Sequence, residues 1–207
     1  MVYNDLKYRK IGEKAMLTVI LTGGGSRRMG RDKAMLKVGE RTMLQHLIDK
    51  YSQSLGTVAV SVNKKSRFPF EGAGEIVDRY PDMGPLNGIV SAFAEYEDDM
   101  IFITGTDLPF GDPALTLRLA ELIGDADACI MRRGKKGFEP LFAIYRRVCG
   151  EKADECLAQG KKSIRDLLES VNVRYVESEE IAEFDLDSIL MNVNTEEEYE
   201  NMKNLMI

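Results

Sequence analysis

Short apolar runs alternate along the chain with longer segments in which apolar residues recur every three or four positions. The runs are rich in β-branched residues, as is typical of buried strands, and they cover Met16–Leu21, Thr57–Val62, Ile76–Val77, Met100–Thr104, Ala128–Met131, Leu141–Tyr145 and Tyr175–Val176. Helical spacing covers Thr42–Ser54, Leu86–Tyr96, Pro113–Ile123, Arg147–Gln159, Ser163–Ser170 and a last helix after Thr195. Strands that alternate with helices predict βαβ units. We therefore expect an α/β fold, with a mostly parallel central sheet covered on both faces.

Polar residues three positions apart mark the predicted starts of three helices. In such a capping box, a hydroxyl accepts a backbone N–H of the first turn, and the later side chain returns a bond to the cap. The three pairs are Thr42 with Gln45, Ser163 with Asp166, and Thr195 with Glu198. Each pair predicts where its helix begins.

The composition is that of an ordinary globular protein, with 44% hydrophobic and 30% charged residues among 207. No linker or charge block divides the chain, so we expect one domain over residues 16–207 after an N-terminal extension, residues 1–15. That extension lacks the apolar stretch of a signal peptide. The apolar runs fall far short of the roughly 20 residues that a membrane span needs. We expect a cytoplasmic protein that binds no membrane.

The formal net charge of −6 argues against nucleic acid as a partner. Cys129, Cys149 and Cys156 form no CxxC pair, and an odd, scattered set indicates reduced thiols in a cytoplasm. The single histidine, His46, excludes a zinc site built from several histidines. These totals leave a local site for a small anion open.

Chemically distinctive residues follow three of the predicted strands. The segment LTGGGSRRMGRDK, residues 21–33, begins as the first strand ends, Asn63 follows the strand that ends at Val62, and Asp107 follows the strand that ends at Thr104. Ligands of parallel α/β sheets bind beyond the carboxyl ends of the strands. We therefore expect these residues at one edge of the sheet.

The glycine-rich segment matches neither of two common phosphate-binding loops. Arg28 stands where the dinucleotide fingerprint needs glycine, and Arg31-Asp32 replaces the Lys-Ser/Thr of the Walker pattern. Glycines nevertheless let backbone N–H groups approach a ligand. Polyphosphate oxygens could bind those groups together with the nearby cations Arg27, Arg28, Arg31 and Lys33. The alternative is a flexible surface loop with solvated charges.

Asp107 lies in TGTDLPF, at the end of an apolar strand and before a proline. Mg²⁺ is commonly bound by one or two carboxylates together with substrate phosphates and waters. Asp107 is therefore a candidate Mg²⁺ ligand beside a candidate polyphosphate loop. The alternative is an aspartate that caps a turn.

Residues 21–33 fit the opening L-A-G-G-x-S-x-R-M-G-x-D-K, with Thr22 in place of the common alanine. On this segment the chain resembles the molybdenum cofactor guanylyltransferase family. The resemblance extends from Met16 to about Met202 and continues in GPLNGI (84–89), TDLPF (106–110), EPLFAIY (139–145), GKKSIRDLL (160–168) and NVNTEEE (192–198). It implies a three-layer, Rossmann-like nucleotidyltransferase fold. Glu139 departs from the glutamine or histidine of many relatives.

The resemblance implies transfer of GMP from GTP to the terminal phosphate of molybdopterin or its molybdenum form, with release of pyrophosphate. It implies Mg²⁺ on Asp107 and catalytic roles for Lys33, Asp107 and Arg28. Asn192 and Asn194 match family asparagines near the metal and the acceptor phosphate. The implied nucleotide contacts are Leu21, Thr22, Gly23, Gly24, Lys33, Asn63, Asp78 and Asp107.

The implied small-molecule partners are GTP and molybdopterin. The resemblance also implies transient contact with molybdenum-insertion proteins or apo-molybdoenzymes, and we expect a monomer. The resemblance also favours guanine, because related cytidylyltransferases usually carry A-A-G where this chain has Gly23-Gly24. Two alternatives stay open: a related nucleotidyltransferase that uses CTP or a sugar or lactyl phosphate acceptor, and a noncatalytic nucleotide-binding module.

Overall fold

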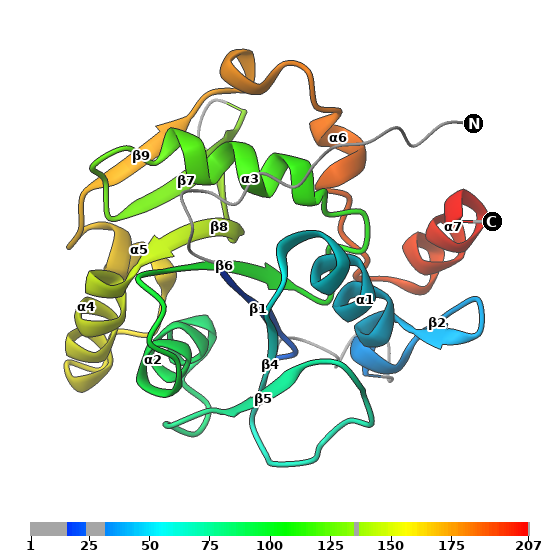
Figure 1. Ribbon diagram of the computed structural model, residues 1–207, viewed down its shortest axis with the longest axis horizontal. Coiled ribbons are helices and arrows are strands. Elements are labelled where there is room, and N and C mark those ends of the chain that lie inside the picture. Colours follow the sequence, from blue (N-terminus) through cyan, green and yellow to red (C-terminus); the bar gives the residue numbers. More distant parts are fainter. Residues whose placement is uncertain (1–15, 24–31, 135–136, 207) are drawn as a thin grey trace.

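The computed structural model describes residues 16–23, 32–134 and 137–206. The predicted extension, Gly24 and Arg28 lie outside these ranges. A seven-stranded sheet in the order β5-β4-β1-β6-β8-β7-β9 forms the centre of the molecule (Figure 1). Its strands are β1 Leu17–Leu21, β4 Val58–Val62, β5 Gly74–Val77, β6 Met100–Gly105, β7 Ala128–Arg133, β8 Gly137–Arg146 and β9 Val173–Val176. All seven apolar runs of the sequence therefore form strands of one sheet.

The helices begin and end close to the predicted boundaries. They are α1 Met43–Leu55, α2 Pro85–Glu95, α3 Pro113–Leu122, α4 Arg147–Ala158, α5 Ile164–Leu168, α6 Leu186–Ile189 and α7 Glu196–Met206. The short α6, the two 3-10 turns Lys33–Met35 and Ser178–Ile181, and the small ribbon of β2 Lys37–Val38 and β3 Arg41–Thr42 were not predicted. These elements are too short for a hydrophobic period to show in the sequence.

Strand β8 runs against the other strands of the sheet and separates β5, β4, β1 and β6 from β7 and β9. β5, β4, β1 and β6 are parallel, whereas β8 is antiparallel to both of its neighbours, β6 and β7. β9 is parallel to β7. The connection from Arg133 to Gly137 is too short for the crossover of a dozen or more residues that a parallel pair needs. The expected α/β fold with a mostly parallel sheet is confirmed, with β8 as the reversed strand.

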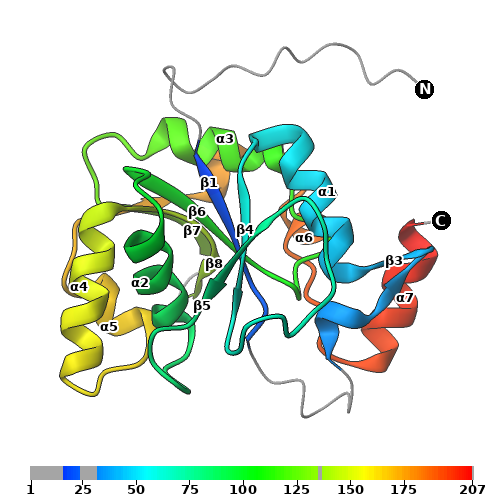
Figure 2. The ribbon, with the colours of Figure 1, turned by 60° about the horizontal axis from the view of Figure 1, so that its bottom comes forward.

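Helices cover both faces of the sheet and complete a three-layer architecture (Figures 1 and 2). One hydrophobic cluster packs α1, α3, α6 and α7 on one face, and a second packs α2, α4 and α5 on the other. The first cluster contains a row of aromatic rings, in which Phe102 lies 5.5 Å from Tyr51 and 4.8 Å from Phe142 between ring centroids. Apolar burial on both faces explains why the strand sequences are almost continuously hydrophobic.

Two of the three predicted capping boxes form completely. Ser163 Oγ accepts the backbone N–H of Asp166 at 3.2 Å, and the Asp166 carboxylate accepts the N–H of Ser163 at 3.2 Å. The Thr195 and Glu198 pair has the same two bonds, at 3.2 and 2.9 Å. Both predictions are confirmed. Each box could be predicted from the sequence because it depends on contacts within a single helical turn.

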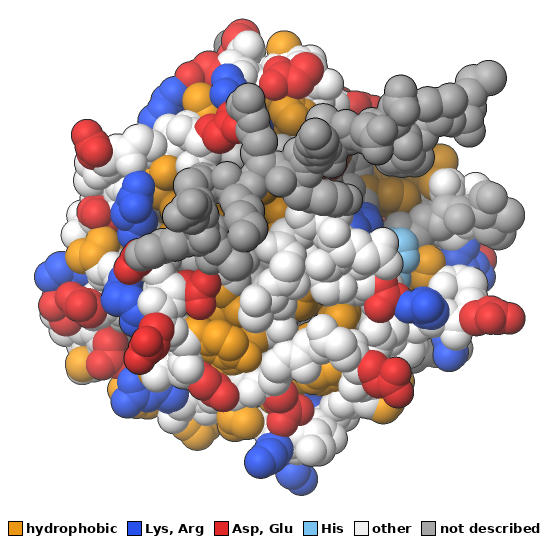
Figure 3. Space-filling view, viewed as in Figure 1, with side chains coloured by type: hydrophobic (Ala, Val, Ile, Leu, Met, Phe, Trp, Pro, Cys, Tyr) orange, Lys and Arg blue, Asp and Glu red, His pale blue; other side chains and the backbone are white. Residues whose placement is uncertain are grey.

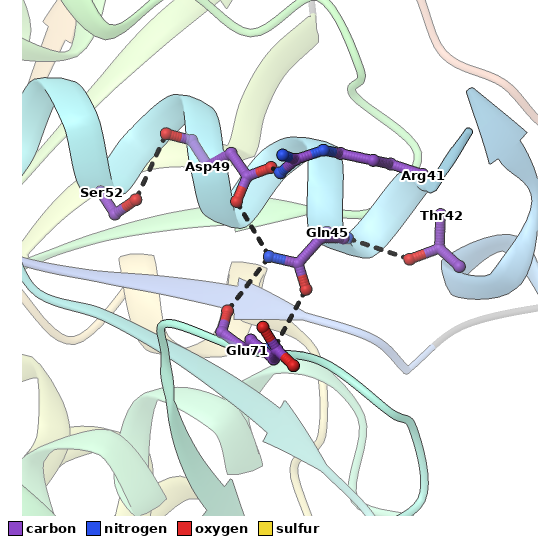
Figure 4. Close-up of polar contacts among 6 residues, drawn as sticks. All are labelled: Arg41, Thr42, Gln45, Asp49, Ser52 and Glu71. Atoms are coloured by element: carbon purple, nitrogen blue, oxygen red, sulfur yellow. Dashed lines mark hydrogen bonds and ion pairs between the residues drawn. The ribbon is translucent and has the colours of Figure 1, made fainter. Parts of the chain in front are cut away.

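The third box forms only by half (Figure 4). Thr42 Oγ1 accepts the N–H of Gln45 at 3.2 Å, as predicted. The Gln45 side chain turns instead to the loop before β5, where it donates to the carbonyl of Glu71 at 3.1 Å and accepts the N–H of Glu71 at 2.9 Å. Asp49, which is paired with Arg41, accepts a further bond from Gln45. A contact across the fold therefore replaces the local one.

Within the described ranges, no helix is both long and apolar enough to cross a bilayer. Figure 3 shows acidic and basic side chains mixed over the face that it displays. The sequence has more Asp and Glu than Lys and Arg, 34 against 28.

Candidate functional site

A cavity of about 560 Å³ opens where β1, β4, β5 and β6 end. Its lining comes from those strand ends, the start of α2, β8 and the segment before α7. The lining residues are Leu21, Gly23, Lys33, Ser61, Asn63, Arg67, Asp78, Asp82, Met83, Gly84, Pro85, Gly88, Gly105, Thr106, Asp107, Leu141 and Asn194. The cavity thus lies at the edge of the sheet where ligands of α/β proteins bind.

Most of the predicted site residues that the structure describes line this cavity. They are Leu21, Gly23, Lys33, Asn63, Asp78, Asp107 and Asn194. Thr22 and Asn192 are not part of the lining. The Thr22 hydroxyl donates to the carbonyl of Ser61 at 2.6 Å, and Asn192 Nδ2 donates to the carbonyl of Leu190 at 3.4 Å.

A short 3-10 turn positions Lys33, only 9% of whose surface is exposed. Asp32 Oδ1 caps this turn by accepting the N–H of Ala34 at 3.3 Å. Lys33 Nζ donates to Asn194 Oδ1 at 2.6 Å, although the two residues are 161 positions apart. Within the described part of the chain, Asn194 is the one hydrogen-bond partner of this ammonium group, which therefore keeps further donor capacity at the cavity wall.

Asn194 is held by the start of α7. Its N–H donates to Glu198 Oε2 at 2.7 Å. This backbone bond is the main cause of the lowered pKa of Glu198, and the charge on Lys33 contributes less. The final helix thus places Asn194 against Lys33.

Asp107 follows β6 and is tied to the segment that contains Asn194. Its carbonyl accepts the N–H of Val193 at 2.9 Å, and Val193 is 1% exposed. A Cβ at position 105 would collide with Asp107 Oδ1, so Gly105 leaves the space that the carboxylate occupies. The fold thereby brings Lys33 and Asp107 to the same cavity.

Lys50 of α1 holds the chain that leaves Asp107. Its Nζ donates to the carbonyls of Pro109 at 2.7 Å and Gly111 at 3.2 Å. Burial lowers the pKa of Lys50 to about 8, and the charge of Asp112 opposes this shift. Lys50 satisfies two loop carbonyls, so its role is to support the backbone near Asp107.

Asp78 follows β5, the edge strand of the sheet, and also lines the cavity. Ser61 Oγ donates to Asp78 Oδ1 at 2.8 Å. Burial raises the pKa of Asp78, while the bond from Ser61 and the charge of Arg67 act in the opposite direction. Ser61 was not predicted, although it is the polar residue that interrupts the apolar run TVAVSV.

Arg67 is a second lining residue that was not predicted. It donates to Asn63 Oδ1 at 2.7 Å through one terminal nitrogen and contacts Asp32 Oδ2 at 2.8 Å through the other. No motif in the sequence marks it, because its position depends on the course of the loop between β4 and β5. Arg67 links the loop after β4 to the residue before Lys33.

The amino end of α2 contributes Gly84, Pro85 and Gly88 to the lining. A Cβ at Gly88 would collide with the Leu21 side chain, so glycine lets the helix approach the end of β1. Pro85 occupies the first helical turn, where its missing N–H costs no bond. The positive end of the helix dipole therefore faces the cavity and favours an anion there.

Charged groups of both signs line the cavity. Within the described lining, Lys33 and Arg67 are positive, whereas Asp78, Asp82 and Asp107 are negative. The described residues contain no cluster of three or more His, Cys, Asp or Glu side chains arranged to bind a metal.

Glu139 lies on β8 near this edge but outside the lining. Its carboxylate is 3.5 Å from an Arg133 nitrogen, and 13% of its side chain is exposed. Burial is the main cause of its raised pKa, and the charge of Asp107 adds to the effect. Glu139 is thus close enough to Asp107 for their charges to interact.

Comparisons with known proteins agree with this architecture. Residues 18–177 match the family model described as the MobA-like NTP transferase domain. A probable molybdenum cofactor guanylyltransferase of Methanosarcina mazei is 32% identical over 197 residues, which cover 89% of this chain and 88% of that protein. One of Carboxydothermus hydrogenoformans is 32% identical over 189 residues, which cover 90% and 94%.

A solved structure shares the fold. The crystal structure of molybdopterin-guanine dinucleotide biosynthesis protein A from Archaeoglobus fulgidus superposes with a TM-score of 0.78 at 25% sequence identity. The match covers 92% of this chain and 98% of that one. The similarity therefore extends over nearly the whole chain in sequence and in structure.

Proposed function

The chain belongs to the MobA-like NTP transferase family, and from that premise we propose that it transfers GMP from GTP to the terminal phosphate of molybdopterin or its molybdenum form. Its relatives are named as probable molybdenum cofactor guanylyltransferases, and the chain is accordingly a nucleotidyltransferase. The observation that carries the proposal is that Lys33, from the glycine-rich segment, and Asp107, from the end of β6, line one cavity. Pyrophosphate is the second product.

The nucleotide spans the cavity from Lys33 to Asp78 in this proposal. Leu21, Thr22, Gly23 and Gly24 approach the triphosphate with their backbone, and Lys33 and the amino end of α2 supply positive charge. Asn63 and Asp78 contact the nucleoside. The carboxylate of Asp78 suits guanine because it accepts hydrogen bonds from donors such as guanine N1–H and N2–H.

The residues present fit a magnesium ion at Asp107. Gly105 leaves room for the Asp107 carboxylate at the cavity wall, and oxygen is the ligand that Mg²⁺ prefers. A bound ion would neutralise charge on the nucleotide phosphates. The three carboxylates of the described lining outnumber its two cations, so a triphosphate needs such compensation together with Arg28 and its basic neighbours.

The protein's own part in the reaction is electrostatic and positional. An oxygen of the acceptor phosphate attacks the α-phosphorus of GTP, and the bond from that phosphorus to the bridging oxygen of pyrophosphate breaks. The acceptor is already an anion and needs no general base. Lys33 and Arg28 stabilise the charge that develops on the transferred and leaving groups. Asn194 holds the Lys33 ammonium. The family resemblance assigns Asn192 and Asn194 to the vicinity of the acceptor phosphate.

We further propose a cytoplasmic monomer that hands its product to molybdenum-insertion proteins or apo-molybdoenzymes through transient contacts. Neither nucleic acid nor a membrane takes part in this account.

The test is incubation of the purified protein with molybdopterin, Mg²⁺ and, in separate reactions, GTP, CTP or ATP. Mass analysis of the pterin product is expected to detect the guanine dinucleotide, with pyrophosphate released in equal amount. A cytosine dinucleotide formed in preference would contradict the guanine assignment. Tight GTP binding without turnover on any acceptor would instead indicate a noncatalytic module.

A further inference from the structure

The loop between β4 and β5, residues 63–73, is built to place Arg67 at the cavity. Ser66 has a positive φ of 53°, which is uncommon for a residue other than glycine. Its N–H donates to both carboxylate oxygens of Glu75, at 3.0 and 2.8 Å. Phe68, on the other side of Arg67, is 8% exposed and packs into the core. The backbone is therefore anchored on both sides of Arg67.

A further anchor holds the end of the same loop. The two hydrogen bonds between the Gln45 side chain and the backbone of Glu71 fasten it to α1 (Figure 4). A side-chain amide that pairs with both backbone groups of one residue reproduces the bonding of a strand neighbour. The loop is thus fixed by contacts within the protein, before any ligand is considered.

The guanidinium of Arg67 is held between two polar partners. It contacts Asp32 Oδ2 at 2.8 Å and Asn63 Oδ1 at 2.7 Å, and it lies 4.8 Å above the Phe68 ring. Of its side chain, 31% is exposed. The other oxygen of Asp32 caps the turn at Lys33, so Asp32 is held independently of Arg67. Asp32 therefore serves as a fixed support for the guanidinium.

The contact with Arg67 determines which group Asn63 offers to the cavity. A carboxamide carries an acceptor oxygen and a donor nitrogen, and a free one can present either by rotating. Arg67 has only donors, so it occupies the oxygen. Among the described residues, the Nδ2 group of Asn63 donates to no partner. Asn63 is thereby left as a hydrogen-bond donor at the cavity wall.

We propose that Arg67 is a positioning residue for nucleobase recognition. By occupying Asn63 Oδ1, it directs Asn63 Nδ2 to an acceptor atom on the base, such as the carbonyl oxygen of guanine. Asp78 then accepts from the donors of the same base. This inference rests on the proposed function, because it takes Asn63 as a contact of the nucleoside.

The test is a double-mutant cycle on GTP affinity, measured by calorimetry with Mg²⁺ present. Asn63→Ala is expected to weaken GTP binding about tenfold, the value of one good hydrogen bond. Arg67→Ala should weaken binding by a similar or smaller factor. Because Arg67 acts through Asn63, the double variant should bind no more weakly than Asn63→Ala. Independent effects that multiply in the double variant would overturn the inference.

Two further measurements separate orientation from charge. Inorganic tripolyphosphate has no base, so Arg67→Ala should leave its affinity within about twofold, whereas an equal loss for tripolyphosphate and GTP would show a phosphate contact instead. Arg67→Lys keeps the charge but cannot bridge Asp32 and Asn63 as a planar fork does. It should therefore bind GTP as weakly as Arg67→Ala, and full rescue by lysine would also overturn the inference.

Lys64→Ala is the matched control, because it removes an exposed cation from the same loop. It should bind GTP as the wild type does. Thermal unfolding of each variant checks that the fold persists. Wild-type protein that binds no GTP would contradict the proposed function and the inference with it. Wild-type binding that Arg67→Ala leaves unchanged would contradict the inference alone.

Discussion

The two halves of the sheet differ in what they present at the cavity edge. β5, β4, β1 and β6 end there, and these strand ends together with the segments that follow them supply most of the lining. From β8, β7 and β9, the described lining takes Leu141 alone. β8 runs in the opposite direction, so its beginning, rather than its end, reaches this edge. β7 and β9 run in the same direction as β6, but they lie beyond the reversed strand β8. Strand direction and position in the sheet together therefore keep the antiparallel half, β8, β7 and β9, away from the site.

Packing differs between the two halves in a related way. β8 bulges opposite the step from Ile130 to Met131, and the buried Tyr145 hydroxyl donates to the carbonyl of Pro140 within that bulge at 2.8 Å. In the parallel half, the hydroxyls of Thr22 and Ser61 bond to groups beside the cavity. In the parallel half, these hydroxyl groups therefore bond beside the cavity. In the antiparallel half, the Tyr145 hydroxyl bonds within its own strand.

A core substitution in the antiparallel half should lower the stability of the protein without lowering its turnover. Ile144 is fully buried between Phe102 and Cys129 in neighbouring strands. Ile144→Ala should lower the free energy of unfolding by roughly 2–5 kcal/mol, and Ile144→Val by roughly 0.5–1.5 kcal/mol. Urea unfolding measures both. Turnover per folded molecule should stay near the wild-type value, and a large loss in Ile144→Val would contradict the division between the halves.

Asp107→Ala should lower turnover and leave stability nearly unchanged. Removal of one preorganised electrostatic group at a reacting centre typically costs about a hundred- to a thousandfold in turnover. Steady-state kinetics of GMP transfer should detect that loss, while the free energy of unfolding changes little. Asp125→Ala, which removes an exposed carboxylate from the turn before β7, is the control and should retain activity. Near-normal transfer by Asp107→Ala would refute the role proposed for Asp107.

Asn194→Ala tests how far the segment before α7 contributes to the parallel half. It removes the bond to Lys33 Nζ, so we expect about a tenfold loss of turnover, because a hydrogen bond to a charged group is worth roughly 1.5 kcal/mol or more. Asn201→Ala, an exposed asparagine of α7, should have no effect. Equal kinetics in both variants would show that Lys33 needs no support from Asn194.

The smallest expected effect concerns the buried thiol of Cys129. Burial raises its pKa from 9.0 to about 12, so the folded chain keeps this proton where the unfolded chain loses it. Stability from this group is present below pH 9 and is lost as the pH rises toward 12. At about pH 9.5 the loss is roughly 0.8 kcal/mol relative to pH 7. Cys129→Ala should remove this part of the pH dependence, and an unchanged slope would contradict it.

Structural features that depend on contacts between residues close in the sequence could be predicted from the sequence. The boxes at Ser163 and Thr195 form as predicted because each needs contacts within one turn. The short link from Arg133 to Gly137 could also have indicated that β8 is antiparallel to β7, because it is too short for a crossover. The hydrophobic pattern does not indicate strand direction, because a buried strand is equally apolar in either direction.

Features that depend on contacts across the fold had no local signal. Gln45 was predicted to complete a cap, but a backbone far along the chain offered it two bonds. Arg67 reaches the cavity because Ser66 adopts a left-handed conformation and Glu75 holds it there. Lys33 and Asn194 meet although they stand near opposite ends of the described chain. Sequence analysis identified Lys33, Asn194 and Asp107 as candidates, and the structure supplied their contacts and the position of Arg67.

The central claim is that the carboxyl ends of the parallel strands hold a nucleoside triphosphate between Lys33 and Asp107. A crystal structure of the protein with GTP and Mg²⁺ tests it most directly. We expect the triphosphate beside Lys33 and Gly23, the metal on Asp107, and the base against Asn63 and Asp78. A nucleotide bound elsewhere, with this cavity unoccupied, would contradict the account.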